Sequence, residues 1–283
     1  AENEIGAINM VMGVAACGRR ALTASSGPGI SLKQEGISYM NQMESPCVIL
    51  NVVRWGNGLG SLDGSQTDYL RETRGGGNGD YRNIVLCPST VQESVDLMYE
   101  AFDIAERHRC IVEVMTDSGL GQMMEPCEFP PFRQGKKCSW GLDGTYRVKR
   151  SDFPNRDIPA ESRKYVEKLE EMRRSEQRWE SVQTEDAEYV FVAFGLCGRM
   201  AKGLVRQLRE QGKKVGIIRP ITAWPFPEKA FEDLSRAQAP LKALITIETN
   251  GEGQMVEDVA LYAKKYGLGQ LPVYALAYVC GVP

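Results

Sequence analysis

The sequence predicts an α/β protein made of two doubly wound, mostly parallel-sheet domains. Strand-like and helix-like segments alternate over residues 4–115 and again over residues 189–276, a pattern typical of parallel sheets with helices on both faces. Residues 48–53 are apolar without interruption, as in strands that are buried on both faces of a parallel sheet. A length of 283 residues suits one large domain or two ordinary ones.

The first region opens with a predicted helix over residues 4–18. Ile5, Ile8, Met12 and Ala15 fall on one face of this helix, which we expect to be its buried face. The elements predicted to follow are a strand at 21–24, a turn at 25–29, a helix at 32–43, strands at 48–53 and 84–87, a helix at 91–107 and a strand at 111–115.

The pattern then breaks into a linker. Residues 125–159 are rich in proline, glycine and charge, and residues 160–182 predict a charged helix. Its face of mixed sign is expected to be solvated or to lie over another subunit. The second region is predicted to hold strands at 189–194, 215–219, 241–247 and 271–276 and helices at 198–211, 225–234 and 253–265.

These elements predict three segments: a first domain at 1–124, the linker at 125–184 and a second domain at 185–283. The chain begins without Met and stops at Val282-Pro283, directly after an apolar run. We therefore expect both ends to be cuts.

Composition argues against several classes of protein. The net charge is −3 and no basic block is present, which argues against nucleic-acid binding. No apolar run approaches the roughly 20 residues that span a bilayer. The eight cysteines contain no Cys-x-x-Cys pair, which argues against a zinc site or a self-contained iron–sulfur cluster. We expect a cytoplasmic protein with reduced thiols.

Common catalytic motifs are missing as well. The sequence has no phosphate-binding Gly-x-x-x-x-Gly-Lys-Ser/Thr and no Gly-x-Ser-x-Gly nucleophile motif. Its one histidine, His108, ends a polar helix and is expected at the surface. The chemistry must therefore come from a carboxylate, an arginine or a bound cofactor.

Four polar segments stand out, and two of them lie at carboxyl ends of predicted strands, where open parallel sheets bind ligands. The segments are Glu-Asn-Glu-Ile-Gly-Ala at 2–7, Thr-Ala-Ser-Ser-Gly-Pro-Gly at 23–29, Asn-Val-Val-Arg-Trp-Gly at 51–56 and Gln-Thr-Asp at 66–68.

These segments, in this order, resemble the alpha subunit of 2-oxoacid:ferredoxin oxidoreductases. The second region adds further matching strings, which resemble the transketolase-C-terminal-like domain of that subunit: Ile-Arg-Pro-Ile-Thr-Ala-Trp-Pro-Phe-Pro at 218–227, Glu248, Asn250 and Gly-Gln-Met-Val-Glu-Asp-Val at 253–259. The resemblance covers nearly the whole chain. Gly58-Leu59-Gly60 and Gly-Gly-Gly-Asn-Gly-Asp at 75–80 look closest to the branched-chain (3-methyl-2-oxobutanoate) type.

The resemblance implies a thiamine-diphosphate-binding pyrimidine domain in which Glu4 contacts the pyrimidine ring. A carboxyl group on the ring nitrogen favours the imino tautomer, which acts as a base within the cofactor. Arg54 matches an arginine near the substrate, and its planar fork of donors suits a carboxylate. The competing interpretations are a helix-start carboxylate for Glu4 and a solvated strand-end arginine for Arg54.

The other matching positions have weaker assignments. Ser26, Gly27 and Gly29 are expected to shape a cofactor-binding loop, with a plain turn as the alternative. Gln66 and Asp68 are expected beside the substrate, although a helix cap explains Asp68 equally well. No metal ligand is assigned to this chain.

The resemblance also implies that the chain works within a larger complex. A beta subunit would hold the diphosphate, magnesium and a 4Fe-4S cluster, and gamma and ferredoxin-like subunits would complete the assembly. The implied reaction decarboxylates a 2-oxoacid oxidatively to acyl-CoA and CO2, and ferredoxin accepts the electrons. We expect this chain to be inactive alone, because a cofactor-contacting threonine in a Tyr-Pro-Ile-Thr-Pro-like string, which precedes this segment in the family, and the magnesium clamp are absent from the sequence given.

Three alternatives remain open. One is the same chemistry on 2-oxoglutarate, for which Arg71 and Arg74 are the nearest candidates for a second cation. Another is a non-catalytic interaction subunit that binds no thiamine diphosphate. The third, a flavodoxin-like binding module, rests on fold analogy alone.

Overall fold

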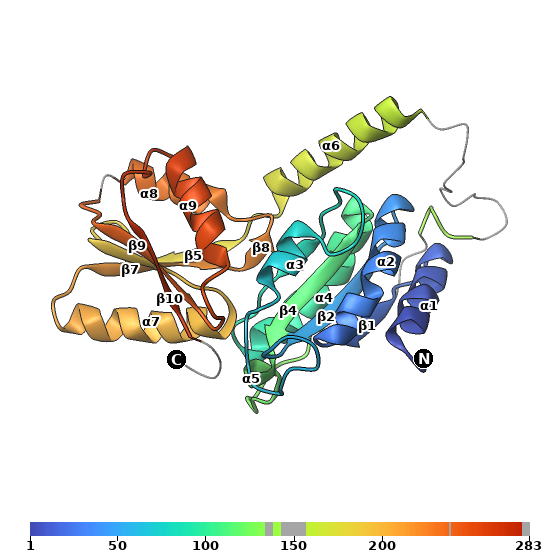
Figure 1. Ribbon diagram of the computed structural model, residues 1–283, viewed down its shortest axis with the longest axis horizontal. Coiled ribbons are helices and arrows are strands. Elements are labelled where there is room, and N and C mark those ends of the chain that lie inside the picture. The colour runs from blue at the N-terminus through green and yellow to red at the C-terminus, as the bar shows by residue number, and fades with distance from the viewer. Residues whose placement is uncertain (134–137, 143–156, 238, 279–283) are drawn as a thin grey trace.

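The computed structural model describes residues 1–133, 138–142, 157–237 and 239–278. Within these residues it contains two five-stranded sheets, one in each half of the elongated molecule (Figure 1). In each sheet the strands are parallel apart from one antiparallel strand at an edge. The predicted fold class, two mostly parallel α/β domains, is confirmed.

The first sheet has the strand order β1-β2-β4-β3-β8. Its strands are β1 (Leu22–Ser25), β2 (Cys47–Val53), β3 (Ile84–Leu86), β4 (Ile111–Asp117) and β8 (Thr222–Trp224). Ser25 pairs with Asn51, and Asn51 pairs with Met115. The carboxyl ends of β1, β2 and β4 therefore lie close together at one edge, where parallel sheets bind ligands.

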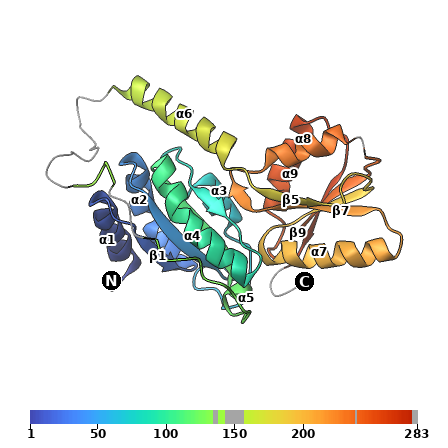
Figure 2. The ribbon, with the colours of Figure 1, turned by 180° about the vertical axis from the view of Figure 1, so that it is seen from behind.

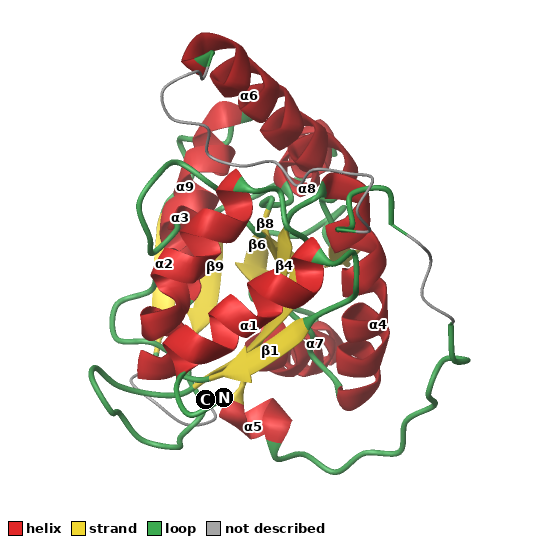
Figure 3. Ribbon diagram, turned by 90° about the vertical axis from the view of Figure 1, so that its right-hand side faces the viewer, coloured by secondary structure: helices red, strands yellow, loops and turns green. Residues whose placement is uncertain are grey.

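Helices cover both faces of the first sheet. They are α1 (Glu4–Ala16), α2 (Pro28–Gln42), α3 (Tyr69–Arg74), α4 (Val91–His108) and the short α5 (Ser118–Gly121). Figure 3 shows α1 and α2 on one side of the strands and α4 on the other. Ile49 belongs to the same buried cluster as Ile8 of α1, whereas its neighbour Val48 clusters with Leu97 of α4. Burial on both faces explains the uninterrupted apolar run of β2.

Two local features set where α1 begins. Asn3 caps the helix, because its Oδ1 accepts a hydrogen bond of 2.8 Å from the backbone N of Gly6. Gly36 of α2 allows the two helices to pack closely, since an added Cβ there would lie 2.5 Å from Cγ2 of Ile8. This packing places the first turn of α1 beside the start of α2.

The second sheet has the order β10-β9-β6-β7-β5. Its strands are β5 (Trp179–Val182), β6 (Tyr189–Val192), β7 (Val215–Pro220), β9 (Ala243–Glu248) and β10 (Val273–Ala277), and its helices are α7 (Gly195–Glu210), α8 (Glu228–Arg236) and α9 (Met255–Lys265). Figure 2 shows α7 on one side of this sheet and α8 and α9 on the other. None of the helices in the described part of the chain is both long and apolar enough to cross a bilayer.

The charged helix is shorter than predicted. The helix α6 (Ile158–Ser175) ends before residue 176, so the prediction of a helix over 160–182 is wrong in its last turns. Residues 179–182 form β5 instead, antiparallel to β7. Figures 1 and 2 show α6 extending from the junction of the two sheets outward over the first domain. The predicted loop at 125–159 lies partly outside the described residues.

His108 is buried against the residue that follows α6, which corrects its predicted surface position. This side chain lies at the end of α4, as predicted, but it is 9% exposed, so the prediction of a surface position is wrong. Its Nε2 lies 2.7 Å from Oε1 of the buried Glu176, and Arg107 donates to the same oxygen at 2.7 Å. Glu176 turns inward to meet these two groups, directly after the last residue of α6.

The buried face of α1 also differs from the prediction. Ile5 is 50% exposed, and the buried residues are Ile8, Val11 and Ala15. With 3.6 residues per turn, Ile5 lies about 90° from the centre of that stripe, which accounts for its exposure.

Each sheet contains a strand from outside its own predicted domain segment. The strand β8 follows the second-domain strand β7 in the chain yet pairs with β3 of the first sheet, and β5 comes from the predicted linker yet joins the second sheet. One buried cluster includes Val112 of β4, Trp224 of β8 and Leu244 of β9. The domain boundaries at 124 and 184 therefore stay a prediction.

Candidate functional site

The loop between β1 and α2, residues 25–29, lies between two of the predicted site residues. An added Cβ at Gly29 would lie 2.7 Å from Oε1 of Glu4, and one at Gly27 would lie 2.9 Å from Nε of Arg54. The structure thus brings together Glu4, Arg54 and the glycines of this loop. Their contacts lie beyond the carboxyl end of β1, where the sheet topology favours a ligand.

The loop needs glycine for two different reasons. Gly27 has φ +52° and caps α2, a backbone region that favours glycine. Gly29 has no such conformation, but it has no room for a side chain, because an added Cβ would lie 2.1 Å from Oγ of Ser25. Pro28 follows at the first helical position, which fixes the start of α2.

Glu4 is the first residue of α1, and its side chain is half-buried. Its Oε1 is 3.5 Å from the hydroxyl of Ser25, which donates. A hydrogen bond of that length is weak, so the carboxylate keeps acceptor capacity for another group.

Arg54 follows the end of β2 and forms an isolated antiparallel bridge with Gly64. The Nε atom of Arg54 is buried, and no described residue accepts a hydrogen bond from it. Because an unsatisfied buried donor is costly, this atom points to an acceptor supplied by a ligand or a partner subunit.

Lys33 is a residue of the site that sequence reasoning missed. It lies one helical turn after Gly29, is only 1% exposed, and its Nζ donates to the carbonyl of Ala24 at 3.4 Å. Burial lowers the pKa of Lys33, and the nearby carboxylate of Glu4 opposes this effect. The i, i+4 spacing from Gly29 was the signal that could have indicated it.

Asp68 lies near the loop but is not a helix cap. It occupies the N-cap position of α3 without a capping hydrogen bond. Its Oδ2 instead accepts from Nδ2 of Asn51 at 3.1 Å and from Arg71. Burial raises the pKa of Asp68, while Arg71 and Asn51 oppose the shift. Arg71 connects Asp68 to the loop, because it also donates to the Gly27 carbonyl at 3.3 Å.

Gln66 is directed away from the loop and into the second domain. Its Nε2 donates to the Phe194 carbonyl at 3.0 Å, and its Oε1 accepts from the Thr249 backbone N at 3.2 Å. The side chain is 3% exposed. These contacts join the two domains, and the expected place of Gln66 beside the substrate stays a prediction.

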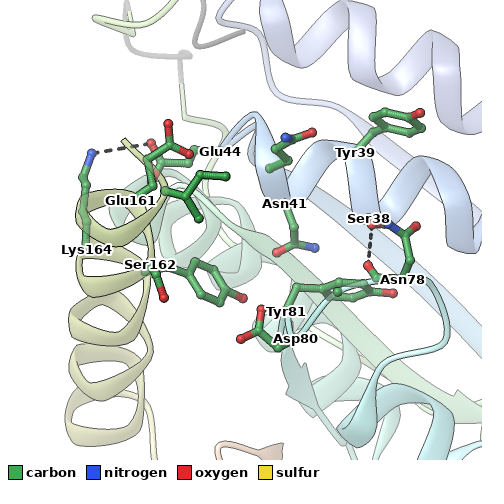
Figure 4. A pocket seen from close by; sticks show the side chains of 14 residues that line it. Ser38, Tyr39, Asn41, Glu44, Asn78, Asp80, Tyr81, Glu161, Ser162 and Lys164 are labelled. Atoms are coloured by element: carbon green, nitrogen blue, oxygen red, sulfur yellow. Dashed lines mark hydrogen bonds and ion pairs between the residues drawn. The ribbon is translucent and has the colours of Figure 1, made fainter. Parts of the chain in front are cut away.

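A cavity of about 560 Å³ lies elsewhere, between the end of α2, the glycine-rich loop 75–80 and the first turns of α6 (Figure 4). Ser38 donates to the Asn78 carbonyl across it at 2.6 Å, and Lys164 lies 3.9 Å from Glu44. None of the predicted site residues lines this cavity. In the described part of the chain, no cluster of His, Cys, Asp and Glu is arranged to hold a metal ion.

Two family models together match residues 1–281 of the chain. Residues 1–189 match the model described as pyruvate flavodoxin/ferredoxin oxidoreductase, thiamine-diphosphate-binding. Residues 187–281 match the model described as pyruvate:ferredoxin oxidoreductase core domain II.

Curated relatives cover most of the chain as well. The ketoisovalerate oxidoreductase subunit VorB of Methanothermobacter marburgensis is 43% identical over 92% of this chain and 75% of its own length. The 2-oxoglutarate synthase subunit KorA of Methanocaldococcus jannaschii is 34% identical over 93% of this chain and 78% of its own.

Solved structures share the fold. The 2-oxoglutarate:ferredoxin oxidoreductase of Magnetococcus marinus matches all of this chain with a TM-score of 0.78 at 21% identity, and this chain spans 54% of that one. A split-gene transketolase, solved as an inactive beta4 tetramer, matches with a TM-score of 0.60 at 13% identity, over 98% of this chain and 72% of its own.

Proposed function

Because this chain belongs to the pyruvate flavodoxin/ferredoxin oxidoreductase family, we propose that it is the subunit that presents Glu4 to the pyrimidine ring of thiamine diphosphate. The proposed reaction is the oxidative decarboxylation of 3-methyl-2-oxobutanoate to acyl-CoA and CO2, with electrons passed to ferredoxin. The observation that carries the proposal is the meeting of Glu4 and Arg54 at the loop 25–29, through contacts with Gly29 and Gly27.

The residues at this loop fit the cofactor. The carboxylate of Glu4 is half-buried, and among the described residues it accepts only the long hydrogen bond from Ser25. It can therefore accept a hydrogen bond from a protonated ring nitrogen. Gly29 has no side chain, which allows the side chains of Ser25 and Glu4 to lie against its backbone. When bound, thiamine diphosphate supplies the electron sink for loss of CO2 from a 2-oxoacid.

Arg54 is proposed to hold the carboxylate of the 2-oxoacid. Its buried and unsatisfied Nε together with its charge would bind one carboxylate, in the manner of guanidinium–carboxylate pairs. The match to the ketoisovalerate oxidoreductase subunit supports a branched-chain substrate.

The 2-oxoglutarate alternative needs a second cation, and the two candidates are already paired. Arg71 contacts Asp68 and Glu72, and Arg74 lies 2.9 Å from Asp258. Neither of these two arginines is therefore available to bind a second substrate carboxylate. Rates on 3-methyl-2-oxobutanoate and 2-oxoglutarate, measured side by side, distinguish the two substrates.

The chain is proposed to act in a complex. A beta subunit would complete the cofactor site and hold magnesium and a 4Fe-4S cluster, and gamma and ferredoxin-like subunits would carry electrons towards ferredoxin. The relatives are themselves named as subunits, which supports an assembly of several chains. The chain is proposed to be inactive without these partners, since Glu4 and Arg54 form only part of a site.

The test is Glu4→Ala in the reassembled complex. We expect turnover to fall by about 100-fold or more, the usual contribution of a group that assists proton transfer. The matched control is Glu2→Ala, which removes an exposed carboxylate from the same end of the chain and should leave turnover unchanged. Near-normal turnover of Glu4→Ala would exclude the proposed role. A wild-type complex that binds no thiamine diphosphate would instead identify a non-catalytic subunit.

A further inference from the structure

Two buried carboxyl groups lie between the first sheet and the helix α3. Glu113 of β4 is 1% exposed and Glu72 of α3 is 3% exposed, and Glu72 lies near enough to Glu113 to raise the pKa of that carboxyl group. Oε1 of Glu113 accepts a hydrogen bond from Nδ2 of Asn83. No donor among the described residues reaches Oε2 of Glu113. Two carboxyl groups that share a hydrogen bond need a proton on one of them.

The contacts of Glu72 decide which group holds that proton. Oε1 of Glu72 accepts from Nδ2 of Asn51 at 2.8 Å and from Nε and Nη2 of Arg71 at 3.0 and 2.9 Å. Three donors, two of them on a cation, stabilise the ionised form of Glu72. Among the described residues, Glu113 accepts a hydrogen bond only from the neutral Asn83. Burial, and after it the nearby Glu72, raises the pKa of Glu113 well above its usual range.

The other groups around Glu113 do not alter this balance. Arg71 is a cation near the pair, but it is shared with Glu72 and with Asp68. The Tyr81 phenol and the Cys47 thiol also lie within electrostatic range, and burial raises the pKa of both. These two groups stay neutral at neutral pH and supply no charge to offset an ionised Glu113.

The pair is linked to the proposed cofactor loop through Arg71. With Nε and Nη2 held by Glu72, and Nη2 also by Asp68, Nη1 of Arg71 donates to the Gly27 carbonyl at 3.3 Å and to Oγ of Ser31 at 3.4 Å. Gly27 in turn packs against Nε of Arg54. A change in the protonation or position of the carboxyl pair would therefore alter the loop through the side chain of Arg71.

We propose that Glu113 is a neutral carboxylic acid that donates its proton from Oε2 to Glu72, and that this pair positions Arg71 and, through it, the loop at Gly27. Glu113 is thus a positioning residue. The first half of the proposal concerns the fold alone, whereas the second half rests on the proposed function of the loop.

The first test measures the affinity of the assembled complex for thiamine diphosphate in matched variants. We expect Glu113→Ala to weaken binding by about tenfold, the cost of one lost hydrogen bond to a charged group, and Glu113→Gln to recover most of it. Glutamine can donate to Glu72 and accept from Asn83, as the neutral acid does. Glu72→Gln should fail to recover the loss of Glu72→Ala, because an amide cannot pair with Arg71. Equal recovery by both glutamines, or by neither, would overturn the positioning role.

The second test needs no cofactor and compares the melting temperature of the wild-type complex with that of Glu113→Gln at several pH values. A carboxyl group whose pKa is raised by folding binds its proton more tightly in the folded state. Its stabilisation is therefore complete below the unfolded pKa of about 4.3 and declines as pH rises towards the folded pKa.

The wild type should accordingly lose melting temperature relative to Glu113→Gln between pH 5 and pH 8. A difference that does not change with pH would show that Glu113 is ionised and would overturn the neutral acid. If the wild-type complex bound no thiamine diphosphate, the proposed function and the positioning role would both fail, while the pH comparison would still decide the state of Glu113.

Discussion

At the scale of single residues, Arg54 combines a charge with a buried donor that no described residue satisfies. We predict that Arg54→Met raises KM for 3-methyl-2-oxobutanoate by about 10- to 100-fold, corresponding to about 1.5–3 kcal/mol for a hydrogen bond to a charged group. Arg54→Lys should recover only part of this, because an ammonium lacks the planar fork. Steady-state kinetics of the reassembled complex provide the measurement.

The control for Arg54 is Arg19→Met, which removes an exposed cation and should leave KM unchanged. A fall in kcat at constant KM for Arg54→Met would contradict a role in binding the substrate.

Sequence reasoning identified Glu4 and Arg54 through a family resemblance, and the structure brings both to the loop. It missed Lys33 and Glu113, because neither residue type is expected in a buried position. Lys33 is buried by the packing of α2 against the first domain, and Glu113 lies within an apolar strand. Gln66 was expected beside the substrate, but its partners Phe194 and Thr249 are distant in sequence, and no local pattern indicates them.

At the scale of elements, the junction of α1, β1 and α2 depends on glycine at the start of α2. We predict that Gly29→Ala lowers the affinity for thiamine diphosphate at least about tenfold, since the new Cβ would displace both Ser25 and Glu4 and cost roughly 1–3 kcal/mol of overpacking or lost contact. Titration of the complex with the cofactor measures the change.

Gly13→Ala in α1 is the matched control. Apart from the backbone of its own helix and its chain neighbours, no atom of the described residues lies within 4 Å of its added Cβ. Alanine in a helix interior is favoured over glycine by up to about 1 kcal/mol. It should raise the melting temperature slightly and leave cofactor affinity as it is. Equal effects of the two substitutions would show that the site does not depend on the loop.

Periodicity predicted most helices and parallel strands, and it failed where pairing is distant. Most of the parallel strands lie inside their sheets and are apolar, so each is visible in a short window of sequence. The parallel strands β1 and β10 lie at sheet edges, but their own residues still have strand-like composition. In contrast, β5 and β8 are short antiparallel edge strands whose partners are distant in sequence. The strand β5, Trp179–Val182, begins only a few residues after the end of the charged helix α6 at Ser175, so a short window of sequence merges the two.

At the scale of the whole molecule, the two sheets are joined by hydrogen bonds around Gln66. We predict that Gln66→Ala destabilises the fold by about 1–3 kcal/mol, because it removes the acceptor of the buried Thr249 amide. The Phe194 carbonyl keeps its hydrogen bond from the backbone N of Gly198. Thermal unfolding of the complex measures this effect.

Gln122→Ala, at an exposed position, provides the comparison and should unfold as the wild type does. If Gln66→Ala kept full stability but raised KM, the side chain would belong to the substrate site after all.

The strand β8 has a consequence for how the gene can be divided. A translated product that stopped after β4, which ends at Asp117, and before β8 would carry all the parallel strands of the first sheet but would leave the outer side of β3 bare. Exposed strand edges recruit other chains, so such a half would tend to aggregate rather than await its other half. A fission of the reading frame between the two domains would have to supply three residues, Thr222–Trp224, to both products.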